Sequence, residues 1–198
     1  MTPELFWEDT KLALDCIQNI TGKKVNAYRA PAFSINSKTS WAIEILSKNG
    51  IEFDSSIFPA QHRYGGFPDF KEEKPLILQS GNYSVKEFPI ALASILGKRV
   101  AFSGGGFFRL IPYNLIRNFA KNKEYIMSYF HLRDFDEDLL KQESIQLAKM
   151  SKIDYFKNFY GINGAYQKFQ KYLNDFQFVN LIEASGKIDW EKAPLIKI

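Results

Sequence analysis

The stretch YRAPAFSI, residues 28–35, places Arg29 two positions before Pro31, at the end of an apolar segment. Residues 25–31 are predicted as a short strand that runs into a turn, because proline disfavours helical backbone at the residue before it. A charged side chain is rarely buried without a partner. At a strand end, Arg29 is expected to hold a carboxylate through paired hydrogen bonds, with a structural salt bridge as the alternative.

Two further segments repeat this order of strand, polar residue and turn. Asp54 follows the apolar residues of IEFDSS, and His131 lies near the end of YIMSYFHL, which is predicted as a strand buried on both faces. The carboxyl ends of parallel strands carry the active sites of α/β folds, so Arg29, Asp54 and His131 are predicted to share a pocket. Histidine suits acid–base work near neutral pH. The alternatives are an Asx-turn or helix cap for Asp54 and a core histidine for His131.

Segments with helical spacing separate these strands. A first helix is predicted to be capped by Thr2, to begin with Pro3 and to end at Gly22, with Cys16 as a small core residue. Helices are also predicted for residues 37–49, the end of 99–122 and 165–175, strands for 83–90 and 176–184, a long loop for 58–75 and irregular structure for 133–160. This alternation indicates an α/β fold with a mostly parallel sheet or barrel, in a single domain over residues 1–198.

Aromatic residues and glycines supply the remaining candidates. The segment SGGGFFRLIPY, residues 103–113, is neither GxGxxG nor a P-loop, so its glycines are expected to allow a close backbone approach. Phe107, Phe108 and Tyr113 are predicted to line a groove for a sugar, with a core turn as the alternative. His62 and Tyr64, in the long loop, are candidate substrate contacts, with plain loop residues as the alternative.

Composition excludes several classes of protein. The chain has 45% hydrophobic and 24% charged residues, a net charge of +4 and no run of five like charges, which does not fit a nucleic-acid binder. Its single cysteine excludes an intrachain disulfide, and two histidines with one cysteine do not make an ordinary zinc site. The first residues lack the pattern of a signal peptide, and no apolar run reaches membrane-span length, so a cytoplasmic location is expected.

Five segments in order resemble the polysaccharide deacetylase family, the NodB-homology domains. They are YRAPAFSI, GIEFDSSIFP, HRYGGFP, GGGFFRLIPY and SYFHLRDFD, and the match runs from about residue 2 to about residue 183. The subgroup is the one found with exopolysaccharide and capsule genes. The resemblance implies a distorted (β/α) barrel that hydrolyses N-acetyl groups of sugars with a zinc-like divalent metal, which polarises the carbonyl and activates water.

The resemblance also implies roles for individual residues. Arg29 corresponds to the arginine that orients the general base, His131 to the general acid that protonates the leaving amine, and Asp54 to the acid that tunes this histidine. The family's Asp-Asp motif and its His-x-x-x-His motif are absent, so the general base and metal ligands are missing. This chain alone is therefore expected to bind no metal. Leu132 and Arg133 stand where the subgroup often has Pro-Trp.

The barrel is accordingly expected to lack its first βα units. Three explanations remain open: a fragment, a shortened protein that binds sugar without hydrolysing it, or a separate polypeptide that supplies the missing strands. The predicted function is that of a polysaccharide deacetylase-like protein of surface-polysaccharide metabolism, and the alternative is an inactive carbohydrate-binding remnant. An unpaired strand edge and apolar surface would favour self-association.

Overall fold

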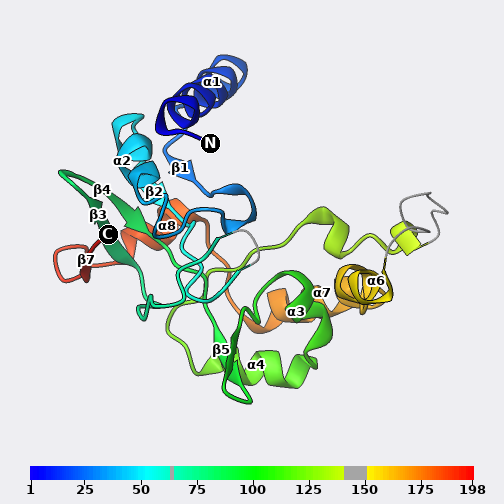
Figure 1. Cartoon of the computed structure of the whole chain (residues 1–198). Helices are drawn as coiled ribbons and strands as arrows, with labels where there is room; N and C mark the ends of the chain where they lie inside the picture. Colours follow the sequence, from blue (N-terminus) through cyan, green and yellow to red (C-terminus); the bar gives the residue numbers. More distant parts are fainter. Residues whose placement is uncertain (63–64, 141–150) are drawn as a thin grey trace. The chain divides into compact units, whose positions relative to one another are not determined.

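The computed structural model describes residues 1–62, 65–140 and 151–198, which form two compact units. Unit 1 comprises residues 1–90 and 180–198, and unit 2 comprises residues 91–179 (Figure 1). Compact units within one chain do not decide how many domains fold independently, so the single domain stays a prediction. Among the described residues, no helix is long and apolar enough to cross a membrane.

A five-stranded sheet organises unit 1. Its order is β1 (Ala27–Tyr28), β2 (Phe53–Asp54), β4 (Tyr83–Glu87), β3 (Leu76–Ser80) and β7 (Leu195–Lys197). The pairs β1–β2, β2–β4 and β3–β7 are parallel, and only the β3–β4 hairpin is antiparallel. The predicted α/β class with a mostly parallel sheet is confirmed. The sheet does not close among the described strands, and the barrel stays a prediction.

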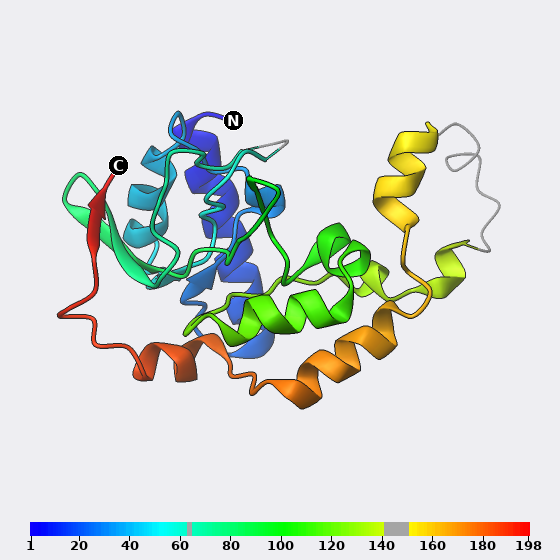
Figure 2. The ribbon, with the colours of Figure 1, turned by 90° about the horizontal axis from the view of Figure 1, so that it is seen from below.

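The helix ends follow the capping residues that the sequence predicts. Helix α1 (Pro3–Thr21) begins after Thr2, whose hydroxyl accepts a hydrogen bond from the Leu5 N–H at 3.3 Å. It ends at Gly22, which has a left-handed φ of 66°. Helix α2 (Trp41–Lys48) lies within the predicted range. It packs beside the β3–β4 hairpin (Figures 1 and 2).

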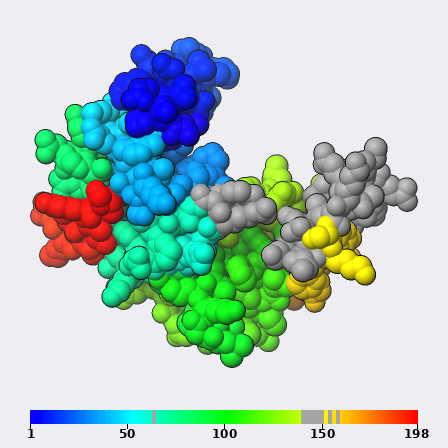
Figure 3. All heavy atoms as spheres, viewed as in Figure 1, coloured from blue at the N-terminus to red at the C-terminus, as the bar shows by residue number. Residues whose placement is uncertain are grey.

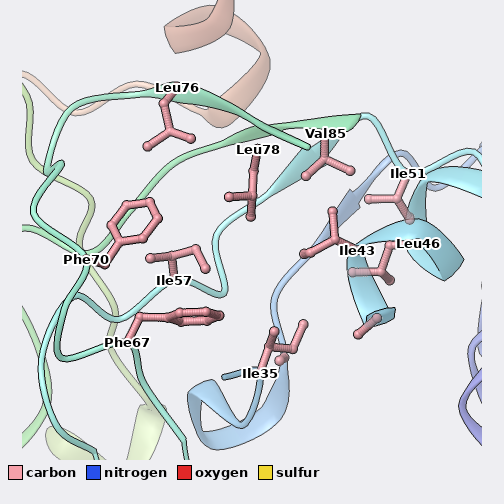
Figure 4. Packing of buried hydrophobic residues seen from close by; sticks show 12 residues of the cluster. Ile35, Ile43, Leu46, Ile51, Ile57, Phe67, Phe70, Leu76, Leu78 and Val85 are labelled. Carbon is pink, nitrogen blue, oxygen red and sulfur yellow. The ribbon is translucent and has the colours of Figure 1, made fainter. Parts of the chain in front are cut away.

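The core of unit 1 lies between α2 and the sheet. Ile43 and Leu46 of α2 have no exposed surface, and neither have Leu76 and Leu78 of β3, so alternate residues of the strand face the helix (Figure 4). Phe67 and Phe70, from the long segment between β2 and β3, complete this cluster. The part of this segment around Phe67 and Phe70 is thus packed against the core of unit 1.

Helix α1 lies largely outside this core. Phe6 packs edge-on against Tyr28 and Trp41, while Leu12 is 70% exposed and Ile20 is 79% exposed. Cys16 is exposed, so its prediction as a core residue is wrong. The helix packs through one narrow side, and Figure 3 shows α1 (dark blue) at the surface of unit 1.

Unit 2 is a helical unit with one small hairpin. Its elements are β5 (Ala93–Ile95), β6 (Lys98–Val100), α3 (Gly105–Leu110), α4 (Tyr113–Lys121), η2 (Leu132–Asp134), η3 (Glu137–Leu140), α6 (Lys152–Phe159) and α7 (Ala165–Asp175). Its core contains Phe102, Phe108, Ile116 and Tyr172. The predicted helices at the end of 99–122 and at 165–175 are confirmed.

Three predicted segments differ from the structure. Residues 125–132 form no strand, and their β-type pairing is limited to an isolated parallel bridge between Gly104 and Tyr129. Residues 176–184 form no strand either, because the Asn180 side chain accepts from the Glu183 N–H at 2.9 Å and starts helix α8 (Leu181–Gly186). The segment 133–160, predicted as irregular, contains α6. Pairs of aromatic residues four positions apart stack along this helix.

Candidate functional site

Three parallel strands of unit 1 end at the same level. Tyr28 of β1 lies opposite Asp54 of β2, and Asp54 lies opposite Glu87 of β4. Arg29 follows directly after β1. The carboxyl edge of the sheet therefore brings together Arg29 and Asp54, which the sequence predicted, and Glu87, which it did not.

Arg29 binds the segment that follows β2. Its Nε donates to the Ser55 carbonyl at 3.1 Å, and its Nη2 donates to Ser55 Oγ at 2.9 Å. The guanidinium also lies over the Phe33 ring, 5.9 Å from the centroid. The Arg29 side chain is exposed, and neutral groups of unit 1, above all Ser55, orient it.

The turn after Arg29 is strained. Pro31–Phe33 form the short helix η1, in which Ala32 has φ 54° and Phe33 has φ 50°. Residues with a side chain rarely adopt this left-handed region, and such strain clusters at functional sites. The Ala30 N–H donates to Ser56 Oγ at 2.8 Å and holds the start of the turn.

Asp54 and Glu87 are both fully buried. Asp54 accepts from Ser56 Oγ at 2.7 Å and from the Ser56 N–H at 3.3 Å, so the Asx-turn alternative is present. Glu87 Oε1 accepts from the Ile57 N–H at 3.0 Å. Burial raises the pKa of Glu87 well above its usual range, the adjacent Asp54 carboxylate raises it further, and Arg29 opposes the rise.

His131 lies in unit 2, and it is exposed, so the core-histidine alternative is wrong. Its N–H donates to Asp134 Oδ2 at 2.9 Å at the start of η2. Asp134 is buried and forms an ion pair with Arg109, whose Nε donates to the Tyr160 carbonyl at 3.2 Å. The backbone of His131 is therefore anchored while its ring is accessible. A pocket shared with Arg29 and Asp54, in unit 1, stays a prediction.

The sequence model of one family, described as a domain of unknown function (DUF3473), matches residues 55–185. The chain belongs to the DUF3473 family. The search of curated proteins and the search of solved structures found no significant match. The family is related to the polysaccharide deacetylases, which confirms the coarser part of the resemblance, and membership of the NodB-homology family stays a prediction.

The predicted aromatic groove of the DUF3473 segment divides into exposed and buried residues. Phe107 on α3 is 43% exposed, whereas Phe108 has no exposed surface and packs against Phe130 and Tyr172. Phe108 therefore matches the core alternative. Tyr113 Oη donates to Asp175 Oδ2 at 2.8 Å, which joins α4 to α7. Partial desolvation and the Asp175 carboxylate raise the pKa of Tyr113 to about 12.

The long loop supplies one candidate within the described residues. His62 packs its ring against Phe33 and Phe58, with centroids 5.7 and 5.1 Å away, and partial burial lowers its pKa. His62 thus lies beside the strained turn that follows Arg29. Tyr64 lies outside the described residues.

Gly104 permits the close backbone approach that the sequence predicts. A Cβ atom at this position would lie 2.1 Å from the Tyr129 carbonyl oxygen, so a side chain does not fit. The glycine run therefore packs against the segment that leads to His131.

The described residues do not assemble a metal site. Within residues 1–62, 65–140 and 151–198, no three histidine, cysteine, aspartate or glutamate side chains gather as a possible ligand set. The described residues thus show no ligand set for the divalent metal that the resemblance implies. The expectation that this chain alone binds no metal stays a prediction.

Proposed function

We propose that the chain is a polysaccharide deacetylase-like protein that takes part in the hydrolysis of N-acetyl groups of sugars in surface-polysaccharide metabolism. The observation that carries the proposal is the alignment of Arg29 and Asp54 at the carboxyl ends of adjacent parallel strands. Membership of the DUF3473 family supports it. A distorted barrel without its first βα units and a cytoplasmic location belong to the same proposal.

The proposed chemistry gives each residue a part. Arg29 presents N–H donors that orient a carboxylate or a developing negative charge, and Ser55 fixes the guanidinium for this task. The exposed ring of His131 protonates the leaving amine as general acid. Asp54 is fully buried and does not touch a substrate, and its tuning of His131 is part of the proposal. In the polysaccharide deacetylases that this chain resembles, a bound divalent metal would supply the activated water.

The test is acetate release from an N-acetylated oligosaccharide by the whole chain with added zinc. Release that a chelator abolishes, and that His131→Ala and Arg29→Ala each reduce at least about tenfold, supports the proposal. Asn114→Ala, an exposed change on α4, is the matched control and should leave the rate unchanged. No release with zinc, or release that a chelator leaves untouched, would refute an activity of this chain.

A second candidate, sugar binding without hydrolysis, rests on exposed aromatic rings of unit 2. Helix α6 contacts α3 and carries Phe156, and Tyr160 follows directly after the helix. The two rings are 48% and 53% exposed, with centroids 4.5 Å apart. Phe107 on α3 is also exposed. Flat rings at the surface suit stacking on pyranose faces. The segment 133–160 was predicted as irregular, so these two rings were not among the predicted sugar contacts.

Calorimetry with N-acetylated oligosaccharides, with and without a chelator, separates the two candidates. Binding that ignores the chelator and weakens at least about threefold in Phe156→Ala and Phe107→Ala supports the binding module. Leu173→Ala, an equally exposed apolar residue on α7, is the control. Binding unaffected by either aromatic substitution would rule out this surface as the sugar site.

A further inference from the structure

The buried carboxyl pair at the end of β2 and β4 contains one atom that its surroundings leave without a donor. Glu87 Oε1 accepts from the Ile57 N–H, but Glu87 Oε2 is buried and has no donor partner. Asp54 and Glu87 face each other across the two strands and have no exposed surface. Two adjacent buried carboxylates repel each other, and an unsatisfied buried carboxylate oxygen is costly.

The hydrogen bonds decide which acid carries the charge. Ser56 Oγ accepts from the Ala30 N–H, so its proton points to Asp54 Oδ1. The Ser56 N–H donates to Asp54 Oδ2. Asp54 thus receives donors on both oxygens and suits the ionised form. Glu87 receives one backbone donor, and a proton on its second oxygen would make a hydrogen bond to Asp54.

We propose that Asp54 and Glu87 share a single proton, carried by Glu87, and that Glu87 is thereby a positioning residue for Arg29. Glu87 is too deeply buried to touch a substrate. It acts through the segment after β2, whose Ile57 it holds and whose Ser55 binds Arg29. Ser55 Oγ in turn donates to the Phe88 carbonyl at 2.8 Å, so the chain beyond Glu87 is joined to the same segment.

The charged and titratable groups of unit 1 around the pair determine the pH response. The positive charge of Arg29 acts on the pair and opposes the raised pKa of Glu87. On β1, burial and the Asp54 carboxylate raise the pKa of Tyr28 to about 12, so Tyr28 is neutral. The raised pKa of Glu87 means that its proton stabilises the folded chain fully below the unfolded pKa near 4.5, and that this stabilisation is lost as pH rises through the folded pKa. Loss of the proton adds a second negative charge, which draws Arg29 away from Ser55.

Urea unfolding of the whole chain between pH 5 and pH 9 tests the shared proton. In the wild type, the unfolding equilibrium constant should rise by up to about tenfold per pH unit over part of this range. Glu87→Gln keeps a donor toward Asp54 and an acceptor for Ile57, so this rise should disappear. Glu191→Gln, an exposed acid of the same unit, should leave the rise unchanged. An unaltered rise in Glu87→Gln would overturn the proposal.

Infrared spectroscopy of the wild type provides a second measurement if Glu87→Gln does not fold. A protonated-carboxyl band at neutral pH that disappears as pH rises is expected, and its absence would also overturn the proposal. The position of Arg29 is read from its 15Nε resonance, which should shift with pH in the wild type and stay constant in Glu87→Gln. The relevance of Arg29 to a reaction rests on the proposed function, but none of these measurements uses activity. Failed acetate release therefore leaves this inference intact.

Discussion

Two buried acids of this chain are stabilised in different ways. Asp134 in unit 2 is paired with the Arg109 guanidinium, and Asp54 in unit 1 is paired with a second acid, Glu87. Arginine keeps its charge at every physiological pH, whereas a shared proton leaves when the pH rises. Unit 2 therefore anchors the backbone of its candidate histidine, His131, with an ion pair whose arginine stays charged. In unit 1, the shared proton makes the position of the candidate arginine, Arg29, depend on pH.

The largest effect is expected where the permanent pair is broken. Asp134→Ala leaves the buried Arg109 unpaired and removes the acceptor of the His131 N–H. We expect a loss of about 3–5 kcal/mol in the stability of unit 2. Amide hydrogen exchange of α7 measures this loss, since the tryptophans, Trp7, Trp41 and Trp190, all lie in unit 1.

The matched control for Asp134→Ala is the exposed neighbour Asp136, which accepts a local hydrogen bond from the Asp138 N–H at 3.1 Å. Asp136→Ala should cost no more than about 1 kcal/mol. If the two substitutions had equal effects, the ion pair would not be the anchor of η2, and the contrast between the two units would fail.

A smaller effect is expected when the proton-sharing pair is broken. Glu87→Ala removes the acceptor of the buried Ile57 N–H and the partner of Asp54. We expect a loss of about 1–3 kcal/mol, and less than about 1 kcal/mol for Glu87→Gln, which keeps both contacts. The fluorescence of Trp190, whose ring lies 5.6 Å from Phe88, follows unfolding of this region. A larger loss in Glu87→Gln than in Glu87→Ala would contradict the pairing.

The sequence predicts features that depend on neighbours along the chain. The limits of α1 follow from Thr2, Pro3 and Gly22, because capping is a local interaction. Arg29 and Asp54 were found because each ends a short apolar run. Both predictions use only the chemistry of a few consecutive residues. The structure confirms the limits of α1 and places Arg29 and Asp54 at strand ends, while their roles stay predictions.

Features that depend on pairing between distant segments were missed. Glu87 also ends a strand, but its proximity to Asp54 follows only from the register of β2 and β4. The prediction that Cys16 is buried was wrong for the same reason. Helical spacing shows that one face of a helix is apolar, but it does not show what packs on that face. Likewise, adjacent Phe107 and Phe108 look alike in the sequence, and the packing of α3 separates them.

A third pair of substitutions replaces each of the two arginines by lysine and compares the losses of stability. Arg109 is 6% exposed and neutralises an acid, whereas Arg29 is exposed and binds Ser55. Arg29→Lys loses the forked contact and should cost about 1 kcal/mol or less, while Arg109→Lys should cost about 2 kcal/mol or more. Urea unfolding of both variants measures the difference. Equal costs would mean that Arg29 is as much a structural residue as Arg109.

The smallest effect on stability is expected for a substitution on α1. This substitution tests whether the difference between the two units is a property of the single chain or of associated copies. The sheet edge at β1 and the exposed Leu12 and Ile20 favour self-association, which would stabilise unit 1 by mass action and not unit 2. Leu12→Glu should change the stability of dilute protein by no more than about 0.5 kcal/mol and should shift sedimentation toward a monomer. Lys11→Glu adds the same acid at an exposed polar position and is the control. If the pH response of Glu87 vanished in monomeric Leu12→Glu, it would belong to an interface between copies and not to the shared proton.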